Sequence, residues 1–226
     1  MTTRLIGSLI MVYGDDNGLV LPPMIAPHQV VILPIFHKKE QKQEVMSFCL
    51  KVLEDLKKSS WMNEPIRVHV DDRDLKGGDK SWSWIKKGVP IRIEVGMREV
   101  ESQKVSVLTR LGDLRERNNV LSSGVSHSIA KALTDIHHLM YQEAEDFRDE
   151  HVTEVKDFKS FKELFSKDQP GFAKVYWCDD AELEDQLAKD QGVTTRCILK
   201  KEGLDHQVCF LTGKKAMCQV IFAKAY

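Results

Sequence analysis

Alternating apolar and polar side chains predict two strands between residues 66 and 96. The ranges 66–70 and 91–95 place an isoleucine or valine at every second position, and a period of two is the signature of a strand. Between them, Gly77 and Gly78 interrupt the pattern, and Asp79 is a suitable N-cap for a short helix that ends at Gly88. This stretch therefore predicts a strand, a loop, a helix and a second strand.

The residues on either side extend the same pattern. Residues 30–35 form an unbroken apolar run, as expected for a strand buried at the centre of a sheet. Residues 40–58 carry an apolar stripe at helical spacing, and residues 104–111 predict a further strand. Strand–helix–strand units within one sheet require right-handed crossovers. We therefore expect an α/β fold, with a mostly parallel or mixed five-stranded sheet and helices on both of its faces.

The first residues of the chain predict a strand without neighbours. Residues 5–12 are an apolar run, which we expect to be a buried strand taken from a larger sheet. The segment 14–18 predicts a turn, and Pro22, Pro23 and Pro27 predict a stiff, extended connector.

The second half of the chain predicts a long helix and a small domain. Apolar residues recur at steps of three and four from residue 126 to about residue 151. His137 and His138 lie on this helix, but adjacent positions diverge by about 100°, so we expect no shared metal ion. Residues 156–226 predict a small α+β domain, with helices at 158–165 and 180–189 and strands at 171–178, 194–199, 208–211 and 219–223.

Composition indicates a globular protein with unevenly distributed charge. The formal net charge of the 226 residues is −1, but residues 30–130 carry 18 basic and 14 acidic side chains, whereas residues 131–190 carry 8 and 16. No apolar run is long enough to predict a membrane span. The first residues do not resemble a secretion leader, and five cysteines favour a reducing compartment. We therefore expect a cytoplasmic location.

The candidate chemistry lies in the segment from Arg73 to Arg98. It contains seven lysines or arginines against three acids, with Trp82 and Trp84 among them. Cations neutralise phosphates and flat aromatic rings stack on unpaired bases, so this composition favours single-stranded RNA as a ligand. The alternative at this point is a half-buried α/β unit whose charged edge is merely solvated.

Three segments in order resemble the C-terminal part of one enzyme family. TTRLIG with GDDNGLVLPPMIAPHQVVILPI is similar to the end of the catalytic domain of class II aminoacyl-tRNA synthetases. More narrowly, it looks like the prolyl-tRNA synthetases of the group common to archaea, eukaryotes and some bacteria. VHVDDRD with KGVPIRIEVG resembles their anticodon-binding domain, and TTRCI with the final FAKAY resembles their C-terminal domain, down to Tyr226.

The resemblance implies domain boundaries and a function. It places a remnant of the catalytic domain and a linker at residues 1–28, an anticodon-binding domain at 29–125, a bridging helix at 126–155 and the small α+β domain at 156–226. The complete enzyme of this family is a homodimer that uses ATP and magnesium to join proline to tRNA(Pro). Arg4 matches an arginine that contacts ATP in the family. Without the other signature motifs, we expect the chain alone to be catalytically inactive and to hold no cofactor.

The resemblance also names candidate RNA-binding residues. The family reads two guanines of the proline anticodon with polar side chains around this helix and the strand that follows it. Arg92 matches the arginine on that strand, Arg98 the cation after the next glycine, and Arg115 approximately a basic position in the following loop. A glutamate of the family is replaced here by Ile85, and we expect Lys80, Trp82 and Trp84 to compensate.

Some relatives carry a zinc site of four cysteines in the C-terminal domain. Here Cys178 and Cys209 occupy one position of each pair, whereas Leu183 and Thr212 replace the other two. Two thiolates do not close a tetrahedral structural site, so we expect no metal.

Two functions from different classes follow. The first is a tRNA(Pro)-binding part of a prolyl-tRNA synthetase. The second is a stand-alone, non-catalytic RNA-binding or interaction protein that reuses the anticodon-binding fold. A zinc-dependent or thiol enzyme is disfavoured by the incomplete set of cysteines.

Overall fold

The computed structural model describes residues 3–224, and the chain divides into two compact units, residues 1–141 and 142–226. The division falls within the longest helix, α5 (Val125–Glu150). The helix expected from residue 126 to about residue 151 is therefore confirmed. Tyr226 lies outside the described residues.

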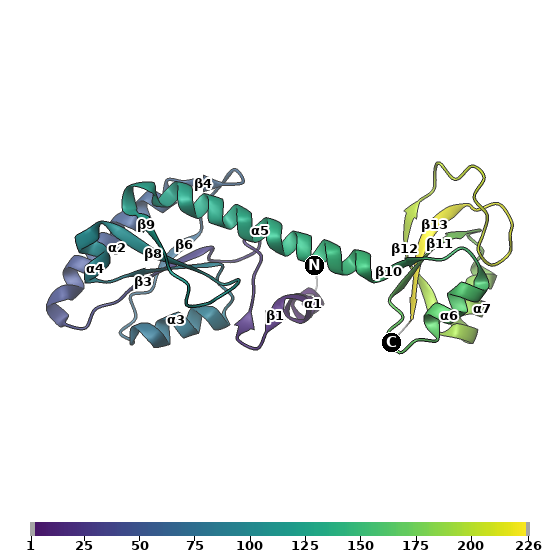
Figure 1. Ribbon diagram of the computed structural model, residues 1–226, viewed down its shortest axis with the longest axis horizontal. Helices are drawn as coiled ribbons and strands as arrows, with labels where there is room; N and C mark the ends of the chain where they lie inside the picture. The colour runs from purple at the N-terminus through teal and green to yellow at the C-terminus, as the bar shows by residue number, and fades with distance from the viewer. Residues whose placement is uncertain (1–2, 225–226) are drawn as a thin grey trace. The chain divides into compact units, whose positions relative to one another are not determined.

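The first unit is organised around a five-stranded mixed sheet (Figure 1). Its strand order is β6 (Val68–Val70), β3 (Val30–Pro34), β7 (Ile91–Val95), β8 (Lys104–Thr109) and β9 (Asn118–Leu121). β3 pairs in parallel with both β6 and β7, whereas β8 is antiparallel to β7 and to β9. The expected fold class is thus confirmed, with β3 buried inside the sheet as its apolar run predicts.

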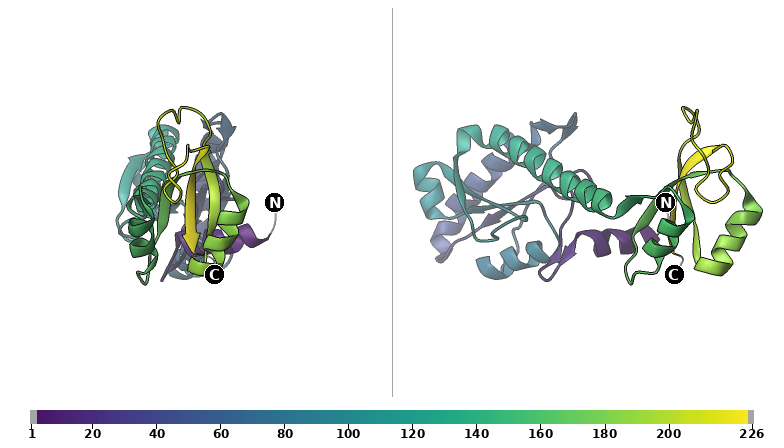
Figure 2. Two further views of the ribbon diagram at one scale, coloured as in Figure 1. Left: turned by 90° about the vertical axis from the view of Figure 1, so that its right-hand side faces the viewer. Right: turned by 45° about the vertical axis from the view of Figure 1, so that its right-hand side comes forward.

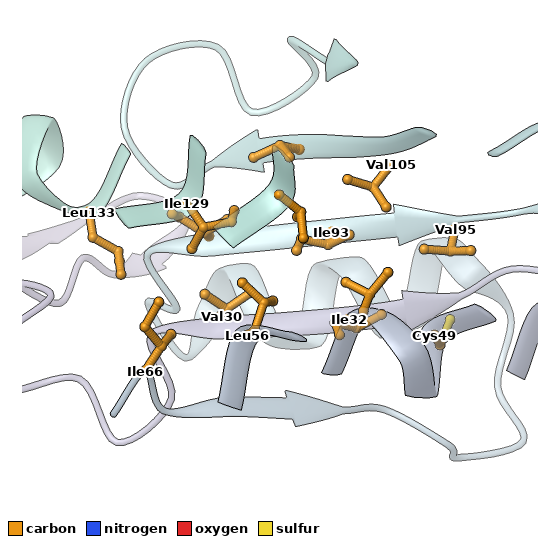
Figure 3. Packing of buried hydrophobic residues seen from close by; sticks show 14 of the residues in the cluster. Val30, Ile32, Cys49, Leu56, Ile66, Ile93, Val95, Val105, Ile129 and Leu133 are labelled. Carbon is orange, nitrogen blue, oxygen red and sulfur yellow. The ribbon is translucent and has the colours of Figure 1, made fainter. Parts of the chain in front are cut away.

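One face of this sheet carries the main apolar core. Ile91, Ile93 and Val95 of β7 pack there together with residues of β3 and β8. Helices α2 (Lys42–Lys57) and α5 supply the opposing side chains, among them Leu56 and Ile129 (Figure 3). Burying each aliphatic side chain of this kind contributes about 1.5–3 kcal/mol, so this face holds the unit together.

Helix α3 (Gly77–Lys86) covers part of the other face (Figure 1). A smaller apolar group of Val31, Leu33, Trp84 and Val89 packs beneath it. The expected N-cap, Asp79, is wrong: the helix begins at Gly77, after an extended Lys76, and Asp79 lies within its first turn. A carboxylate in the first turn still favours the positive end of the helix dipole, which explains the similar sequence signal.

The N-terminal apolar run forms a helix, α1 (Arg4–Tyr13), rather than the expected buried strand. None of its described residues is buried. A helix satisfies its backbone hydrogen bonds within the segment, whereas a strand needs a neighbouring strand to pair with. The expected turn follows as a hairpin of β1 (Gly14–Asp15) and β2 (Gly18–Leu19), which Asp15 ties to the unit through an ion pair with Arg110.

The remaining elements of the first unit are short. A second hairpin joins β4 (Ser60–Trp61) to β5 (Glu64–Pro65), and 3₁₀ turns lie at Lys39–Gln41 and Ser122–Gly124. Helix α4 (Met97–Ser102) follows β7 directly, with Glu99 capping the Gly96 N–H. No helix of the described chain is long and apolar enough to cross a membrane.

The second unit is a small α+β structure, as expected. Its sheet has the order β10 (Val152–Glu154), β11 (Phe172–Trp177), β13 (Cys218–Lys224) and β12 (Val193–Lys200), with β13 between two neighbours (Figure 2). Helices α6 (Phe158–Phe165) and α7 (Ala181–Gln191) share one core with it. The strand expected at 208–211 is wrong, because only an isolated bridge between Val208 and Lys215 forms there.

Candidate nucleic-acid interface

A cavity of about 1010 Å³ opens on the face of the first unit that α3 partly covers. Its walls come from residues 34–37 at the end of β3 and just after it, from α3 and the loop before it, and from β7. The turn between β1 and β2, β8 and the loop between β8 and β9 complete the lining. Pockets for single small ligands have volumes of about 300–1,000 Å³. This cavity therefore has room for more than one nucleobase.

Arg92 forms the floor of the cavity. The parity of its strand places it opposite Ile91 and Ile93, and it is only 1% exposed. One terminal nitrogen, Nη1, donates to Ser81 of α3, and Nη2 donates to the carbonyl of Leu114 at 2.8 Å. Its Nε is buried and has no hydrogen-bond partner among residues 3–224. Burial lowers the pKa of this guanidinium, but the ordinary value is so high that it stays charged.

Glu94 lies two residues further along β7 and joins the large cavity to a smaller one of about 440 Å³. Its Oε2 accepts hydrogen bonds from Arg117 Nε at 3.2 Å and Nη2 at 2.8 Å. Arg98 lines the smaller cavity and is exposed. The two cavities thus share an acid–base pair at their border.

Trp82 and Arg115 line the large cavity on its exposed side. The indole of Trp82 is 45% exposed, and Arg115 is exposed on the loop after β8. The structure thus brings three of the six RNA-binding candidates, Arg92, Trp82 and Arg115, to one cavity. Arg98 lies at its neighbour.

Lys80 and Trp84 belong to a separate buried network. Lys80 is 1% exposed and donates to the carbonyl of Asp71 at 3.0 Å, and burial lowers its pKa. Trp84 donates from Nε1 to the Asp71 carboxylate at 2.8 Å. Arg73 donates to the same carboxylate, which holds the pKa of Asp71 well below its usual range. Neither Lys80 nor Trp84 lines either of these cavities.

The sequence around this cavity is similar to domains of known function. A family model described as "Anticodon binding domain" matches residues 29–130, and one described as "Prolyl-tRNA synthetase, C-terminal" matches residues 158–226. The proline–tRNA ligase of Protochlamydia amoebophila is 38% identical to the chain, and the match covers 100% of this chain and 46% of that protein. The chain belongs to the prolyl-tRNA synthetase family.

Other members of the prolyl-tRNA synthetase family give the same picture. The proline–tRNA ligase of Alkaliphilus oremlandii is 40% identical, with 100% of this chain and 45% of that protein covered. The crystal structure of prolyl-tRNA synthetase from Cryptosporidium parvum, complexed with L-proline and AMP, matches with a TM-score of 0.80 and 32% identity, over 100% of this chain and 47% of that one. The chain spans about half the length of the curated relatives it matches and corresponds to their C-terminal half. These matches do not favour the stand-alone alternative.

Arg4, the candidate ATP contact of the synthetase family, is exposed on α1. Neither of the two cavities described above includes it. A single arginine neutralises only part of a triphosphate and positions none of the reacting atoms. The residues around Arg4 therefore do not fit an ATP site by themselves.

The cysteine positions of the synthetase C-terminal domain do not fit zinc. Burial raises the pKa of Cys178, and the neighbouring Cys209 thiol acts in the same direction. Burial also opposes ionisation of Cys209, but the groups around it, chiefly Thr212, lower its pKa overall. Leu183 packs against the apolar core and offers no ligand atom. Among residues 3–224, no group of three or more histidines, cysteines or acids is arranged to hold a metal ion.

Three polar residues of the interface are missing from the sequence-based candidates. Ser81 holds Arg92, while Glu94 and Arg117 form the pair between the cavities. Glu94 occupies the same polar register of its strand as Arg92, so the alternation could have found it. Arg117 lies in an irregular loop, where sequence pattern gives no direction to a side chain.

Proposed function

We propose that the chain binds the anticodon loop of tRNA(Pro), as the tRNA-reading part of a proline–tRNA ligase. The observation that carries this proposal is the large cavity, which combines an exposed indole, a buried guanidinium and exposed cations within the region that matches an anticodon-binding domain. Single-stranded RNA is read by stacking on aromatic rings and by hydrogen bonds to base edges. In this cavity the exposed indole offers a stacking surface, and the buried guanidinium and the exposed cations offer hydrogen-bond donors and positive charge.

Each candidate residue has a distinct role in this proposal. Trp82 stacks on an unpaired base, which contributes about 1–3 kcal/mol per base. Arg115 and Arg98 neutralise phosphates at the entrances of the two cavities. Arg92 presents a fixed positive charge at the floor, and its contacts with Ser81 and Leu114 hold it in place before RNA arrives. Lys80 and Trp84 shape α3 from within and do not touch the RNA.

The complete enzyme extends beyond these residues. It is proposed to use ATP and magnesium, to act in the cytoplasm and to form a homodimer. The chain alone is not expected to form prolyl-adenylate, because Arg4 lacks the remaining ligands of a nucleotide site. A cytoplasmic location agrees with the five free cysteines, since thiols persist in a reducing compartment.

Binding of defined RNAs tests the proposal. We expect the chain to bind tRNA(Pro) about 5- to 150-fold more tightly than the same tRNA with its anticodon guanines replaced by adenine, the discrimination that one well-placed polar pair provides. Affinity should fall steeply with salt, because phosphate contacts release counterions. Equal affinity for both RNAs would contradict the assignment.

Arg92→Ala sharpens this test. The substitution should flatten the preference for anticodon guanines, measured by filter binding on protein whose circular dichroism is unchanged. Lys51→Ala is the matched control, because Lys51 is an exposed cation on α2, which packs on the opposite face of the sheet. The control should keep the full preference. A preference that survives in Arg92→Ala would count against the role of Arg92.

A further inference from the structure

The large cavity has a single acidic residue. Its lining includes Lys76, Arg92, Arg115 and Arg117, and among these described lining residues Glu94 alone carries a carboxylate. Ile85, which replaces an acid in the resemblance to the family, also lines the cavity. The cavity therefore still contains a negatively charged hydrogen-bond acceptor, but this group comes from β7 rather than from α3.

One oxygen of the Glu94 carboxylate is held by Arg117, and the other is free to accept a hydrogen bond from a ligand. β7 pairs with β3 and β8, which fixes the backbone of Glu94 opposite Leu33 and Ser106. Both hydrogen bonds from Arg117 end on Oε2. Among residues 3–224, no hydrogen bond reaches Oε1, and Oε1 is not one of the sealed, unpartnered atoms. Oε1 is therefore accessible to solvent, its acceptor capacity is unused, and the residue itself lines the large cavity.

The neighbouring Arg92 does not neutralise this carboxylate directly. Its terminal nitrogens are engaged by Ser81 and Leu114, and the ion pair of Glu94 is with Arg117. Arg117 is itself 55% exposed at its side chain, so it moves at little cost. The border of the two cavities thus offers a buried acceptor beside an adjustable donor.

This donor–acceptor order matches one nucleobase. The Watson–Crick edge of guanine presents N1–H and N2–H donors next to the O6 acceptor. An ionised carboxylate only accepts hydrogen bonds, and a guanidinium only donates them. Adenine and cytosine turn an acceptor nitrogen toward the carboxylate, which leaves both groups unsatisfied, and a site built for such bonds strongly rejects a partner that lacks them.

We propose that Glu94 determines guanine specificity in this cavity by accepting hydrogen bonds from guanine N1–H and N2–H, while Arg117 donates to O6. The inference rests on the proposed function, because it names which group reads the anticodon. It assigns the reading of the base edge to Glu94, with Arg92 as the positioning charge beneath it.

Inosine in place of each anticodon guanine tests the assignment, because inosine keeps N1–H and O6 but lacks the N2 amino group. The full chain should lose about 5- to 150-fold in affinity on substitution of the guanine held by Glu94. Glu94→Gln should bind the guanine and inosine forms within about threefold of each other, because its amide does not accept both donors. Filter binding gives these ratios, and thermal unfolding confirms that the variant is folded.

Glu101→Gln is the matched control. It removes the same charge from the exposed surface of α4 and should keep the wild-type ratio of guanine to inosine affinity. Glu94→Asp retains the charge but withdraws it by one methylene, and should give a reduced ratio even if Glu94→Gln does not fold. A wild-type ratio in a folded Glu94 variant would overturn the assignment while leaving tRNA(Pro) binding intact. Equal binding of all anticodons by the unmodified chain would overturn the proposed function as well.

Discussion

The two faces of the five-stranded sheet are built from alternate residues of the same strands. On β7, Ile91 and Ile93 face the core with α2 and α5, whereas Arg92 and Glu94 face the cavity under α3. The first face is apolar, mostly aliphatic, and its side chains gain free energy by leaving water. The second buries charges, which costs free energy unless each charge is paired or hydrogen-bonded.

This contrast shows where stability and recognition are placed. Buried charge on the cavity face is tolerated because partners are supplied: Arg117 for Glu94, Ser81 for Arg92, and Arg73 for Asp71. Within the described part of the chain, the buried Nε of Arg92 finds no hydrogen-bond partner on this face. Buried charges and unpaired buried donors lower stability, and they are typical of functional sites.

The largest expected effect is on the apolar face. Ile93→Ala should lower the free energy of unfolding by about 2–5 kcal/mol, because Ile93 is fully buried and truncation leaves a cavity. Urea denaturation at neutral pH measures this loss. A loss below about 1 kcal/mol would show that this face does not carry the stability of the unit.

The next effect is on the buried network of the opposite face. Asp71→Asn should cost about 1–3 kcal/mol, because it weakens the hydrogen bonds from Arg73 and Trp84 to the carboxylate. The pKa of Asp71 is lower in the folded state, chiefly through Arg73. The ionised Asp71 carboxylate therefore stabilises the fold fully above its unfolded pKa of about 4. This stabilisation is lost as the pH falls from that value toward the lower pKa of the folded state.

Urea denaturation of both proteins from neutral to acidic pH tests this sign. The difference in unfolding free energy between wild type and Asp71→Asn should shrink as the pH drops below about 4. A difference that grows on acidification would mean that the ionised carboxylate does not stabilise the fold.

Removal of the exposed Trp82 ring should weaken RNA binding and leave the stability of the fold almost unchanged. Trp82→Ala should weaken binding of the tRNA(Pro) anticodon loop by about 1–3 kcal/mol, and should change the unfolding free energy by about 0.5 kcal/mol or less, as for other exposed positions. Leu50→Ala is the control, since Leu50 is 48% exposed on α2 and lines neither of the two cavities under discussion. Unchanged binding by Trp82→Ala would remove the stacking contact from the proposal.

The smallest expected effect is at the edge of the second cavity. Arg98→Ala should reduce affinity equally for all anticodons and lower the slope of log affinity against log salt by about 1, as expected for one lost phosphate contact. A salt titration of wild type and variant measures this slope. A sequence-dependent loss would instead place Arg98 on a base.

Regular elements were predictable where one periodicity dominated. The unbroken apolar run of β3 predicted a central strand, and the alternation of β7 placed Arg92 on the face away from the aliphatic core. Residues 5–12 failed, because a continuous apolar run fits a helix and a strand equally well. The short strands β9 and β10 were missed, since their four and three residues are too few to show a period.

The candidate interface was predictable only in part. Cations and indoles between Arg73 and Arg98 indicated the right region, but charge alone does not separate Lys80, which is buried against Asp71, from Arg115, which lines the cavity. Helix α3 has an inner and an outer side, and Lys80, Trp84 and Trp82 divide between them. Which side each residue takes depends on how the helix packs on the sheet.

The sequence by itself determined the α/β class, the buried strands and the family likeness, because hydrophobic periodicity and local motifs are properties of short segments. The tertiary structure alone decided which polar groups share a cavity. Ser81, Glu94 and Arg117 come from a helix, a strand and a loop, and they meet Arg92 only when the sheet forms and α3 packs on it. Such proximity depends on the long-range packing of separate elements, which no local pattern of residues encodes.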